Sequence, residues 1–494
     1  MGVIIKQSIS NTIFTFIGFV IGACNALFLY IHILGETYYG LTTFILSTAN
    51  LAMPFFAFGT PNTLLKFFQG YDSNESRSNF LSLMLILPIF ASIPLIILGY
   101  FFQEQIGTFV SQRNANGKDF LGLIVIIAIL MAYFEVLYAY AKAFLKSVFG
   151  NFLKEVLLRV LISIGLVLVY YQYLSSLEFI YLLILIYGVI TMIMAFWAFS
   201  IQKPSLRLLK LNNQKEILKF TSFIVFSSSI ALMLLELDKF MIYSMLPSQQ
   251  NAYYSVATFI ALTISVPLRA MHQITHPVTS ELMLKKDTIN LQKLYRRTSI
   301  TLQFIGGLLF IGISCNISQI YAILNKPEYT AAIPVVLLIS LAKYIDLMMG
   351  NNNSIIYNSK YYTKVLAIGI FIVGLAVLLN WYLIPIYGII GAAIATLITL
   401  VIYNLMKLGF VTIKLKLFPF SIKTFYSFLV TFISLILFYH WDFSYLPIIN
   451  IILKSILISI FYIGVHYFLN ISNDINGLIK SVLNKLVLFV KRIF

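Results

Sequence analysis

Three charged residues interrupt an apolar stretch near the middle of the chain, "LLELDKFMIY" at residues 234–243. Glu236 and Lys239 are three residues apart, so on a helix they share a face and can pair. Asp238 points elsewhere, about 200° around the helix from Glu236. Charges kept in apolar surroundings commonly mark a substrate or ion path. We therefore predict that Lys239 contacts a substrate and Asp238 a coupling ion, with purely structural roles as the alternative.

A basic stripe follows in "RAMHQITH" at 269–276. Arg269, His272 and His276 are spaced i, i+3, i+7 and therefore lie along one side of a helix. A diphosphate would bind such a stripe through charge-assisted hydrogen bonds. The alternative is that Arg269 extends toward water while the histidines pack. The segment "HQITH" lacks the Glu of a zinc-protease motif, so it does not predict a metal site.

A second charged pair lies further along the chain. Lys343 and Asp346 are again three residues apart, and structural pairing is favoured because their charges cancel. Lys343 remains a candidate substrate ligand. The polar run "GNNNS" at 350–354 follows directly, and it is either an aqueous mouth or a frayed helix end.

The first half of the chain carries fewer charges. Glu135 has no partner at helical spacing within its own apolar run, so it is a candidate proton or cation site, unless another segment supplies a partner. Asn25 is a candidate substrate ligand that ends a stripe of polar and small residues, which suits close helix packing or a hydroxyl-rich substrate. The stripe consists of Asn11, Thr15, Gly18, Gly22 and Asn25. Lys454 is a further isolated charge to which the sequence assigns no role.

Composition indicates which elements position these residues. Of the 494 residues, 60% are hydrophobic and 10% are charged, whereas soluble domains carry about 25% charged residues. Apolar runs of about 20 residues, long enough to cross a bilayer, recur along the whole chain. They are too long and continuous for the strands of a membrane barrel. The sequence predicts an all-α polytopic membrane protein. The 14 expected spans lie near 8–33, 40–64, 80–101, 119–143, 151–174, 177–200, 217–246, 250–276, 297–320, 330–357, 361–381, 388–413, 420–440 and 446–470.

The net charge is +17, and the basic residues that produce it are distributed as the predicted topology requires. Of the 34 Lys and Arg residues, 27 lie on segments of one side and only Arg113, Lys118 and Lys326 on the other, with four inside spans. This asymmetry is the positive-inside rule, and it predicts that both termini are cytoplasmic. Segments 203–219 and 471–494 are weakly amphipathic, so we expect contact with membrane lipids. Nucleic acid is not an expected partner.

Neither the loops nor the motifs indicate an enzyme. The longest outside loop, 102–118, is too short for a soluble domain. The chain has two cysteines, both within expected spans, and no nucleophile elbow, phosphate loop or CxxC pair. These features predict neither a metal nor another cofactor.

A repeat relates the two halves. "YYGLTTF" at 38–44 is echoed by "YYSVATF" at 253–259, and two prolines follow each copy in the same span. The offset corresponds to about six spans, an even number, so the repeat is parallel. Parallel repeats build transporters in which two lobes move around a central site. A duplication without a transport role is the alternative.

The chain resembles the multidrug/oligosaccharidyl-lipid/polysaccharide exporter superfamily, and within it the polysaccharide transporters that include O-antigen flippases. Spacing and order along the whole chain carry the resemblance. Pro385 is expected to end one helix, and small residues from Gly388 onward are expected to let the next helix pack closely. The stretches concerned are "LGETYYGL" (34–41), "ELDKFMIYSMLPSQQNAYYSVA" (236–257), "NSKYYTKV" (358–365) and "NWYLIPIYGIIGAAIATLIT" (380–399).

The resemblance implies an N-lobe at 1–200, a C-lobe at 201–415, and two further spans with a cytoplasmic amphipathic tail at 416–494. It implies a flippase in the bacterial cytoplasmic (inner) membrane. Such a flippase would move an undecaprenyl-diphosphate-linked oligosaccharide, such as an O-antigen (lipopolysaccharide) or capsule unit, to the outer leaflet by alternating access. Proton or sodium coupling, and contact with polysaccharide polymerase and chain-length proteins, are expected on the same ground.

Three alternatives remain. A multidrug or toxic-compound cation antiporter of the same superfamily would line its cavity with acids, whereas the stripe at 269–276 is basic. A peptidoglycan-precursor flippase would also need a basic cavity. A polymerase or ligase of the same pathway would need a large outside loop, and this chain has none.

Overall fold

The computed structural model describes residues 2–114, 117–205, 213–472, 474–477 and 480–481. Every regular element in these residues is helical, as predicted. The contacts divide the chain into two compact units: unit 1 comprises residues 1–256 and 369–392, and unit 2 comprises 257–368 and 393–494.

The predicted lobes have other boundaries, at residues 200 and 415, and they stay a prediction that the family resemblance implies. Part of the predicted amphipathic segments, 206–212 and 482–494, lies outside the described residues.

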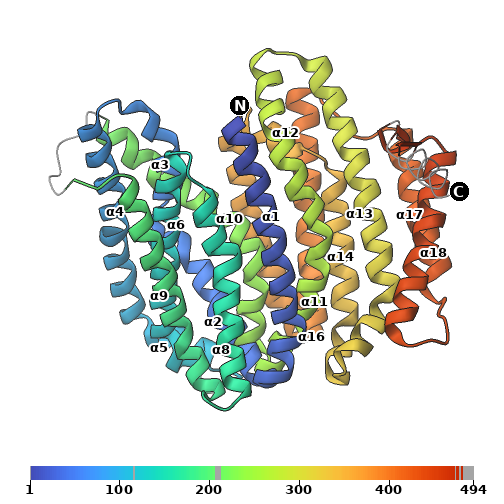
Figure 1. Ribbon diagram of the computed structural model, residues 1–494, viewed down its shortest axis with the longest axis horizontal. Helices are drawn as coiled ribbons and strands as arrows, with labels where there is room; N and C mark the ends of the chain where they lie inside the picture. The colour runs from blue at the N-terminus through green and yellow to red at the C-terminus, as the bar shows by residue number, and fades with distance from the viewer. Residues whose placement is uncertain (1, 115–116, 206–212, 473, 478–479, 482–494) are drawn as a thin grey trace, which may run out of the picture. The chain divides into compact units, whose positions relative to one another are not determined.

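Unit 1 is a bundle of long helices joined by short turns (Figure 1). A capping box formed by Ser175 and Glu178 opens its helix α9. This motif satisfies backbone N–H groups that a helix start leaves unpaired. The elements are α1 (Gly2–Cys24), the π-helix η1 (Asn25–Leu34), α2 (Gly35–Ala57), α3 (Thr60–Phe67), η2 (Phe68–Gly70), α4 (Asn74–Phe101), α5 (Gln103–Val110), η3 (Gly117–Phe120), α6 (Leu121–Ala143), α7 (Val148–Phe152), the π-helix η4 (Leu153–Leu157), α8 (Leu158–Tyr170), α9 (Ser176–Ile201), α10 (Gln214–Met245), most of α11 (Ser248–Leu262) and the middle of α16 (Tyr362–Leu415).

The core of unit 1 forms around α2, which packs against both α6 and α10, while α6 also packs against α9. Phe44 of α2 is fully buried and stacks on Tyr243 of α10, with ring centroids 4.0 Å apart. Ile127 and Ala128 of α6 are likewise fully buried. The helices that carry Glu135 and Asp238 are therefore held by packing at the centre of this unit.

Unit 2 forms around one long helix, α13, which packs against α12, α14, α17 and α18. Asp287 caps the start of α13 by accepting a hydrogen bond from the Asn290 N–H at 3.0 Å, and the bonds from Asn290 lower the pKa of this carboxyl group. The elements are η5 (Thr263–Ser265), α12 (Val266–Leu284), α13 (Thr288–Leu324), η6 (Pro327–Ala332), α14 (Ile333–Met348), α15 (Asn352–Tyr357), the two ends of α16, α17 (Ile422–Tyr439) and α18 (Pro447–Phe468).

The described residues contain 11 helical segments long and apolar enough to cross a membrane. Two of them, Ile9–Ala57 and Ala367–Leu415, have 49 residues each, about twice the length that a bilayer needs. Each is interrupted where the sequence predicts a turn between two spans, at Gly35 (φ 70°) and at Gly388 (φ 59°). The predicted span 151–174 is divided among α7, η4 and α8. The total of 14 crossings remains a prediction.

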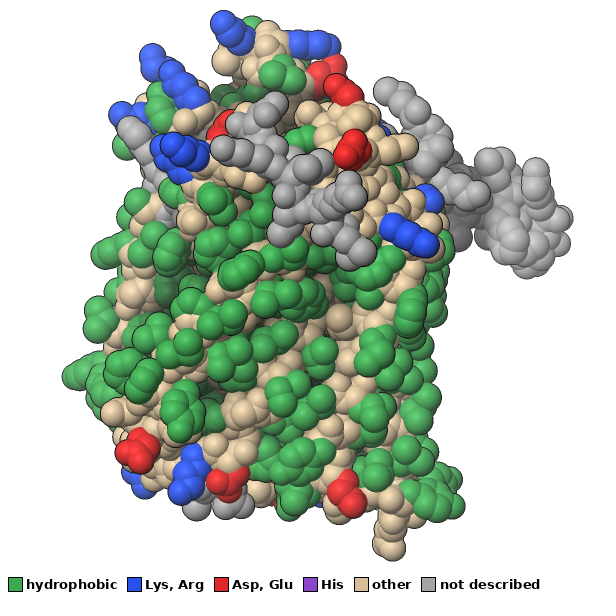
Figure 2. All heavy atoms as spheres, turned by 90° about the vertical axis from the view of Figure 1, so that its left-hand side faces the viewer, with side chains coloured by type: hydrophobic (Ala, Val, Ile, Leu, Met, Phe, Trp, Pro, Cys, Tyr) green, Lys and Arg blue, Asp and Glu red, His purple; other side chains and the backbone are tan. Residues whose placement is uncertain are grey.

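An apolar band covers the face of the molecule seen in Figure 2, with charged side chains above and below it. Large apolar side chains of α4 and α9 are exposed rather than buried, among them Phe90, Ile97 and Phe196. Exposed apolar area of this extent is unfavourable in water and favourable against lipid. The protein is therefore a multi-pass membrane protein.

Candidate functional site

The charges of α10 are arranged as their spacing predicts. Lys239 donates a hydrogen bond to Glu236 at 2.8 Å, and both side chains are less than one-fifth exposed. Asp238 points away from them and is 7% exposed. Its carboxylate accepts hydrogen bonds from the Tyr254 hydroxyl at 2.6 Å and from the Asn380 amide at 2.7 Å. One carboxylate thus joins α10, α11 and α16 within unit 1.

Glu135 has the partner from another segment that its own span lacks. Lys154, in the π-helix η4, donates to the Glu135 carboxylate, although its own side chain is 44% exposed. Next to this pair, Arg159 donates to the Glu155 carboxylate at 2.7 Å. The role of Glu135 in ion coupling stays a prediction.

The small and polar stripe of α1 packs against the segment that carries these ion pairs. Asn11 donates to Ser147 at 3.0 Å, and Gly18 and Gly22 lie directly against the Arg159 side chain. Asn25 is 4% exposed and donates to the Arg159 carbonyl at 3.0 Å. The side chain of Asn25 is therefore engaged in helix packing, and substrate binding by it stays a prediction.

The basic stripe lies on α12 in unit 2. Arg269 and His276 are exposed, while His272 is half-buried. The Nδ1 atom of His272 lies 3.2 Å from the Ser354 hydroxyl, on α15. His272 also lies within electrostatic range of Asp346, His276 and Lys407.

Lys407 is a candidate site residue that the sequence analysis does not single out. In the structure it is 2% exposed. Its ammonium group donates to Asn353 at 3.1 Å and lies 4.2 Å from the centre of the Tyr403 ring. Asp346 and Lys343, both on α14, are within its electrostatic range. The available signal was a lysine inside an apolar span, six residues before its end.

The polar run 350–354 is neither exposed nor frayed. Asn351 is fully buried and donates to Thr279 at 2.9 Å. Asn352, and Asn404 on α16, are each 1% exposed, and their side-chain amides have no hydrogen-bond partner in the described part of the chain. An unpartnered buried amide costs about 1–3 kcal/mol. The hydrogen-bonding capacity of these two amides is therefore not used within the described residues. No group of His, Cys, Asp and Glu side chains in the described residues could hold a metal ion.

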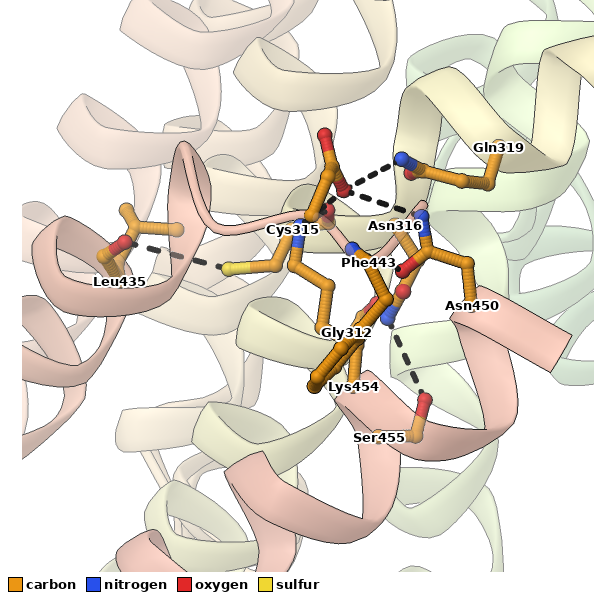
Figure 3. Close-up of polar contacts among 10 residues, drawn as sticks. Gly312, Cys315, Asn316, Gln319, Leu435, Phe443, Asn450, Lys454 and Ser455 are labelled. Carbon is orange, nitrogen blue, oxygen red and sulfur yellow. Dashed lines mark hydrogen bonds and ion pairs between the residues drawn. The ribbon is translucent and has the colours of Figure 1, made fainter. Parts of the chain in front are cut away.

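Lys454 has a structural explanation (Figure 3). It is fully buried in α18, and its ammonium group donates to the Cys315 carbonyl at 2.6 Å and to Asp442 at 3.0 Å. Asp442 also accepts a hydrogen bond from Gln319 at 2.5 Å. Lys454 thus fastens α18 and the turn before it to α13.

The chain resembles a known protein family in sequence and several solved structures in fold. The family model described as polysaccharide biosynthesis protein matches residues 4–283, more than half of the chain. The chain belongs to this family. No curated protein matches its sequence.

Solved structures of this fold are transporters. The lipid II flippase MurJ in an inward closed conformation has a TM-score of 0.75 and 17% identity, covering 94% of this chain and 100% of that one. An inward-facing multidrug resistance MATE transporter of the MOP superfamily has a TM-score of 0.56 and 14% identity, covering 81% and 96%. A MATE transporter of Vibrio cholerae has a TM-score of 0.54 and 14% identity, covering 81% and 94%. At these identities the likeness shows a shared fold. The polysaccharide biosynthesis family member thus has the fold of MOP-superfamily transporters.

Proposed function

We propose that the protein is a flippase that moves an undecaprenyl-diphosphate-linked oligosaccharide from the cytoplasmic to the outer leaflet of a bacterial inner membrane by alternating access. The O-antigen or capsule unit is the proposed cargo, with the polymerase and chain-length proteins of that pathway as partners. Membership of the polysaccharide biosynthesis family and the transporter fold support this proposal.

The observation that carries the proposal is the buried basic cluster of unit 2, defined as His272, Lys343, Lys407, Asn352 and Asn404. Lys407 lies within electrostatic range of the Asp346 carboxylate and of a second cation, Lys343, so cations outnumber acids among the groups named here and the cluster favours an anion. The two asparagine amides can donate hydrogen bonds that no group in the described residues takes up. Multiple charge-assisted donors are what a diphosphate requires. A drug antiporter, which handles cations, would place an excess of acids here.

Asp238 is the proposed coupling residue. Its carboxylate accepts hydrogen bonds from the neutral groups of Tyr254 and Asn380. Because Asp238 joins three helices, its charge state would act on the packing of all three.

The test is translocation in proteoliposomes that contain the purified protein and a fluorescent undecaprenyl-diphosphate-linked oligosaccharide. Quenching from outside measures the fraction in the outer leaflet. We expect the wild type to equilibrate the leaflets and Lys407→Met to be at least tenfold slower. Lys414→Met, on the exposed end of the same helix, is the matched control and should be normal. No translocation by the wild type, or normal translocation by Lys407→Met, would contradict the proposal.

A peptidoglycan-precursor flippase is the second candidate, favoured by the TM-score of 0.75 to the lipid II flippase. The same proteoliposomes loaded with fluorescent lipid II distinguish the two. Translocation of lipid II but not of the oligosaccharide lipid would decide for this second function. Drug susceptibility of cells that express the protein tests the multidrug alternative.

A further inference from the structure

A second polar site lies inside unit 1, in a cavity of about 290 Å³. Its charged lining consists of two ion pairs, Glu135 with Lys154 and Glu155 with Arg159. Helices α2, α9 and α10 complete the walls. Helix α9 contributes Tyr187, and α10 contributes Leu232. The cavity therefore combines four charges and two aromatic rings, those of Phe134 and Tyr187, within the membrane-spanning part of one unit.

The local backbone turns these charges toward the cavity. Lys154 and Glu155 are both in η4, a π-helical segment. Such segments are rare, shift the following side chains around the helix axis, and occur mostly at functional sites. Arg159 is supported from behind by α1, where its guanidinium Nε would lie 3.1 Å from a Cβ atom at Gly22. The site thus depends on an irregular helix and on positions without side chains.

The charges that line the cavity balance, and this defines the class of ligand. Lys142 lies within electrostatic range of Glu135 but is outside the lining, and its ammonium group lies 3.7 Å from the centre of the Tyr138 ring. Two cations and two carboxylates leave no net attraction for a phosphate or for a cationic drug. Each ion pair uses only part of its hydrogen-bonding capacity, because an ammonium group has three N–H donors and a carboxylate about four acceptor positions. The Lys154 and Arg159 side chains are still 44% and 32% exposed. The lining therefore includes both hydrogen-bond donors and acceptors with remaining capacity.

Sugar hydroxyl groups match a lining that offers both donors and acceptors, because each of them both donates and accepts. Tyr187 and Phe134 contribute aromatic rings, against which the apolar C–H face of a pyranose can pack. The volume lies at the lower limit of about 300–1,000 Å³ for sites that hold drug-sized molecules. It therefore suits a single uncharged sugar ring.

We propose that this cavity binds one uncharged sugar ring of the transported glycan, separately from the diphosphate site of unit 2. The inference rests on the proposed flippase function for the identity of the glycan. Its alternative is that the two ion pairs only stabilise unit 1.

A variant that fills the cavity distinguishes sugar binding from a purely stabilising role of the two ion pairs. Leu232→Trp places an indole in the cavity and leaves all four charges intact. Ala91→Trp is the matched control, because Ala91 lines an apolar hollow of about 500 Å³ in the same unit that has no charged lining. We expect Leu232→Trp to reduce oligosaccharide-lipid translocation at least tenfold and Ala91→Trp to leave it within twofold. Normal translocation by Leu232→Trp would overturn the inference and leave the flippase function standing.

Direct binding provides the second readout. The probe is the free oligosaccharide that mild acid releases from the lipid-linked pool of the host, and saturation-transfer NMR detects even weak binding of it. Sugar signals should appear with the wild type and with Lys407→Met, and should disappear with Leu232→Trp. Their absence with the wild type would overturn the inference. Sugar signals without any oligosaccharide-lipid translocation would instead contradict the flippase function alone.

If Leu232→Trp does not fold, a double variant tests sugar binding in its place. Glu135→Gln with Lys154→Gln removes one ion pair, adds no net charge and keeps polar groups in the cavity. Loss of the sugar signals at an unchanged melting temperature supports the inference. Full binding by this folded variant contradicts it.

Discussion

The ammonium group of Lys454 lies 3.0 Å from the carboxylate of Asp442, yet the lysine side chain is 1% exposed and the aspartate side chain 50% exposed. Water can therefore solvate Asp442 if Lys454 is removed, whereas Lys454 has no access to water if Asp442 is removed. The pair is asymmetric, and the two possible deletions should differ in their effect.

Asp442→Ala should destabilise the protein by about 3 kcal/mol, because it leaves a buried cation without its counter-ion. Lys454→Met removes the charge and nearly keeps the shape, so we expect a change below about 1 kcal/mol. Thermal unfolding in detergent, followed by the accessibility of Cys315, measures both. A larger loss for Lys454→Met than for Asp442→Ala would contradict this account.

Both termini should be cytoplasmic and residues 102–118 should face outside. The charge distribution motivates this prediction, and the structure indicates where to test it. Asn114 donates to the Tyr243 carbonyl and the Leu246 carbonyl, so the exposed Gln112 is the better position for a cysteine. Gln112→Cys and Asn213→Cys, in a Cys24→Ser background, should label from opposite sides of the membrane. Labelling from the same side would reject the topology.

Arg269→Ala should abolish export if the stripe on α12 receives the diphosphate, while Arg269→Lys should retain part of it. Lysine keeps the charge but loses the planar fork that binds phosphate bidentately. Export by a complemented deletion strain is the measurement, with protein level as the control. Near-normal export by a well-expressed Arg269→Ala variant would show that this exposed arginine only reaches toward the membrane surface.

Glu135→Gln should impair export more than folding, because the partly exposed Lys154 can be solvated after its partner is lost. Comparison with Lys154→Met separates two explanations. Equal losses of export indicate that the ion pair itself matters, and a loss confined to Glu135→Gln indicates that the carboxylate carries the coupled ion. Normal export by Glu135→Gln at normal expression would reject both.

The helical membrane fold and several local contacts could be predicted because they depend on composition and short-range spacing. Glu236 and Lys239 pair because they are three residues apart on one helix. The long helices break at Gly35 and Gly388, where one apolar run ends and the next begins. Glycine tolerates the positive φ angle that each break requires.

Other features depend on segments distant in the sequence, and spacing says nothing about them. Lys154 is 19 residues from Glu135, and its approach requires the π-helix η4, for which no sequence signal was available. Lys407 lies near the end of an expected span, and this position does not indicate whether its side chain points into the protein or toward water. Only the packing of α15 against α16 shows that its ammonium group is directed into the protein.

The contact of Gly18 and Gly22 with Arg159 also has an evolutionary consequence. A methyl group at position 18 would collide with the Glu155 carbonyl and the Arg159 guanidinium. Gly22 meets only the Arg159 side chain, so Gly22 and the arginine should be inherited together, whereas Gly18 is also required by the backbone of residue 155. In relatives that lack the arginine, position 22 is expected to accept alanine, serine or larger residues while position 18 stays glycine, so covariation between columns 22 and 159 would trace how the cavity arose.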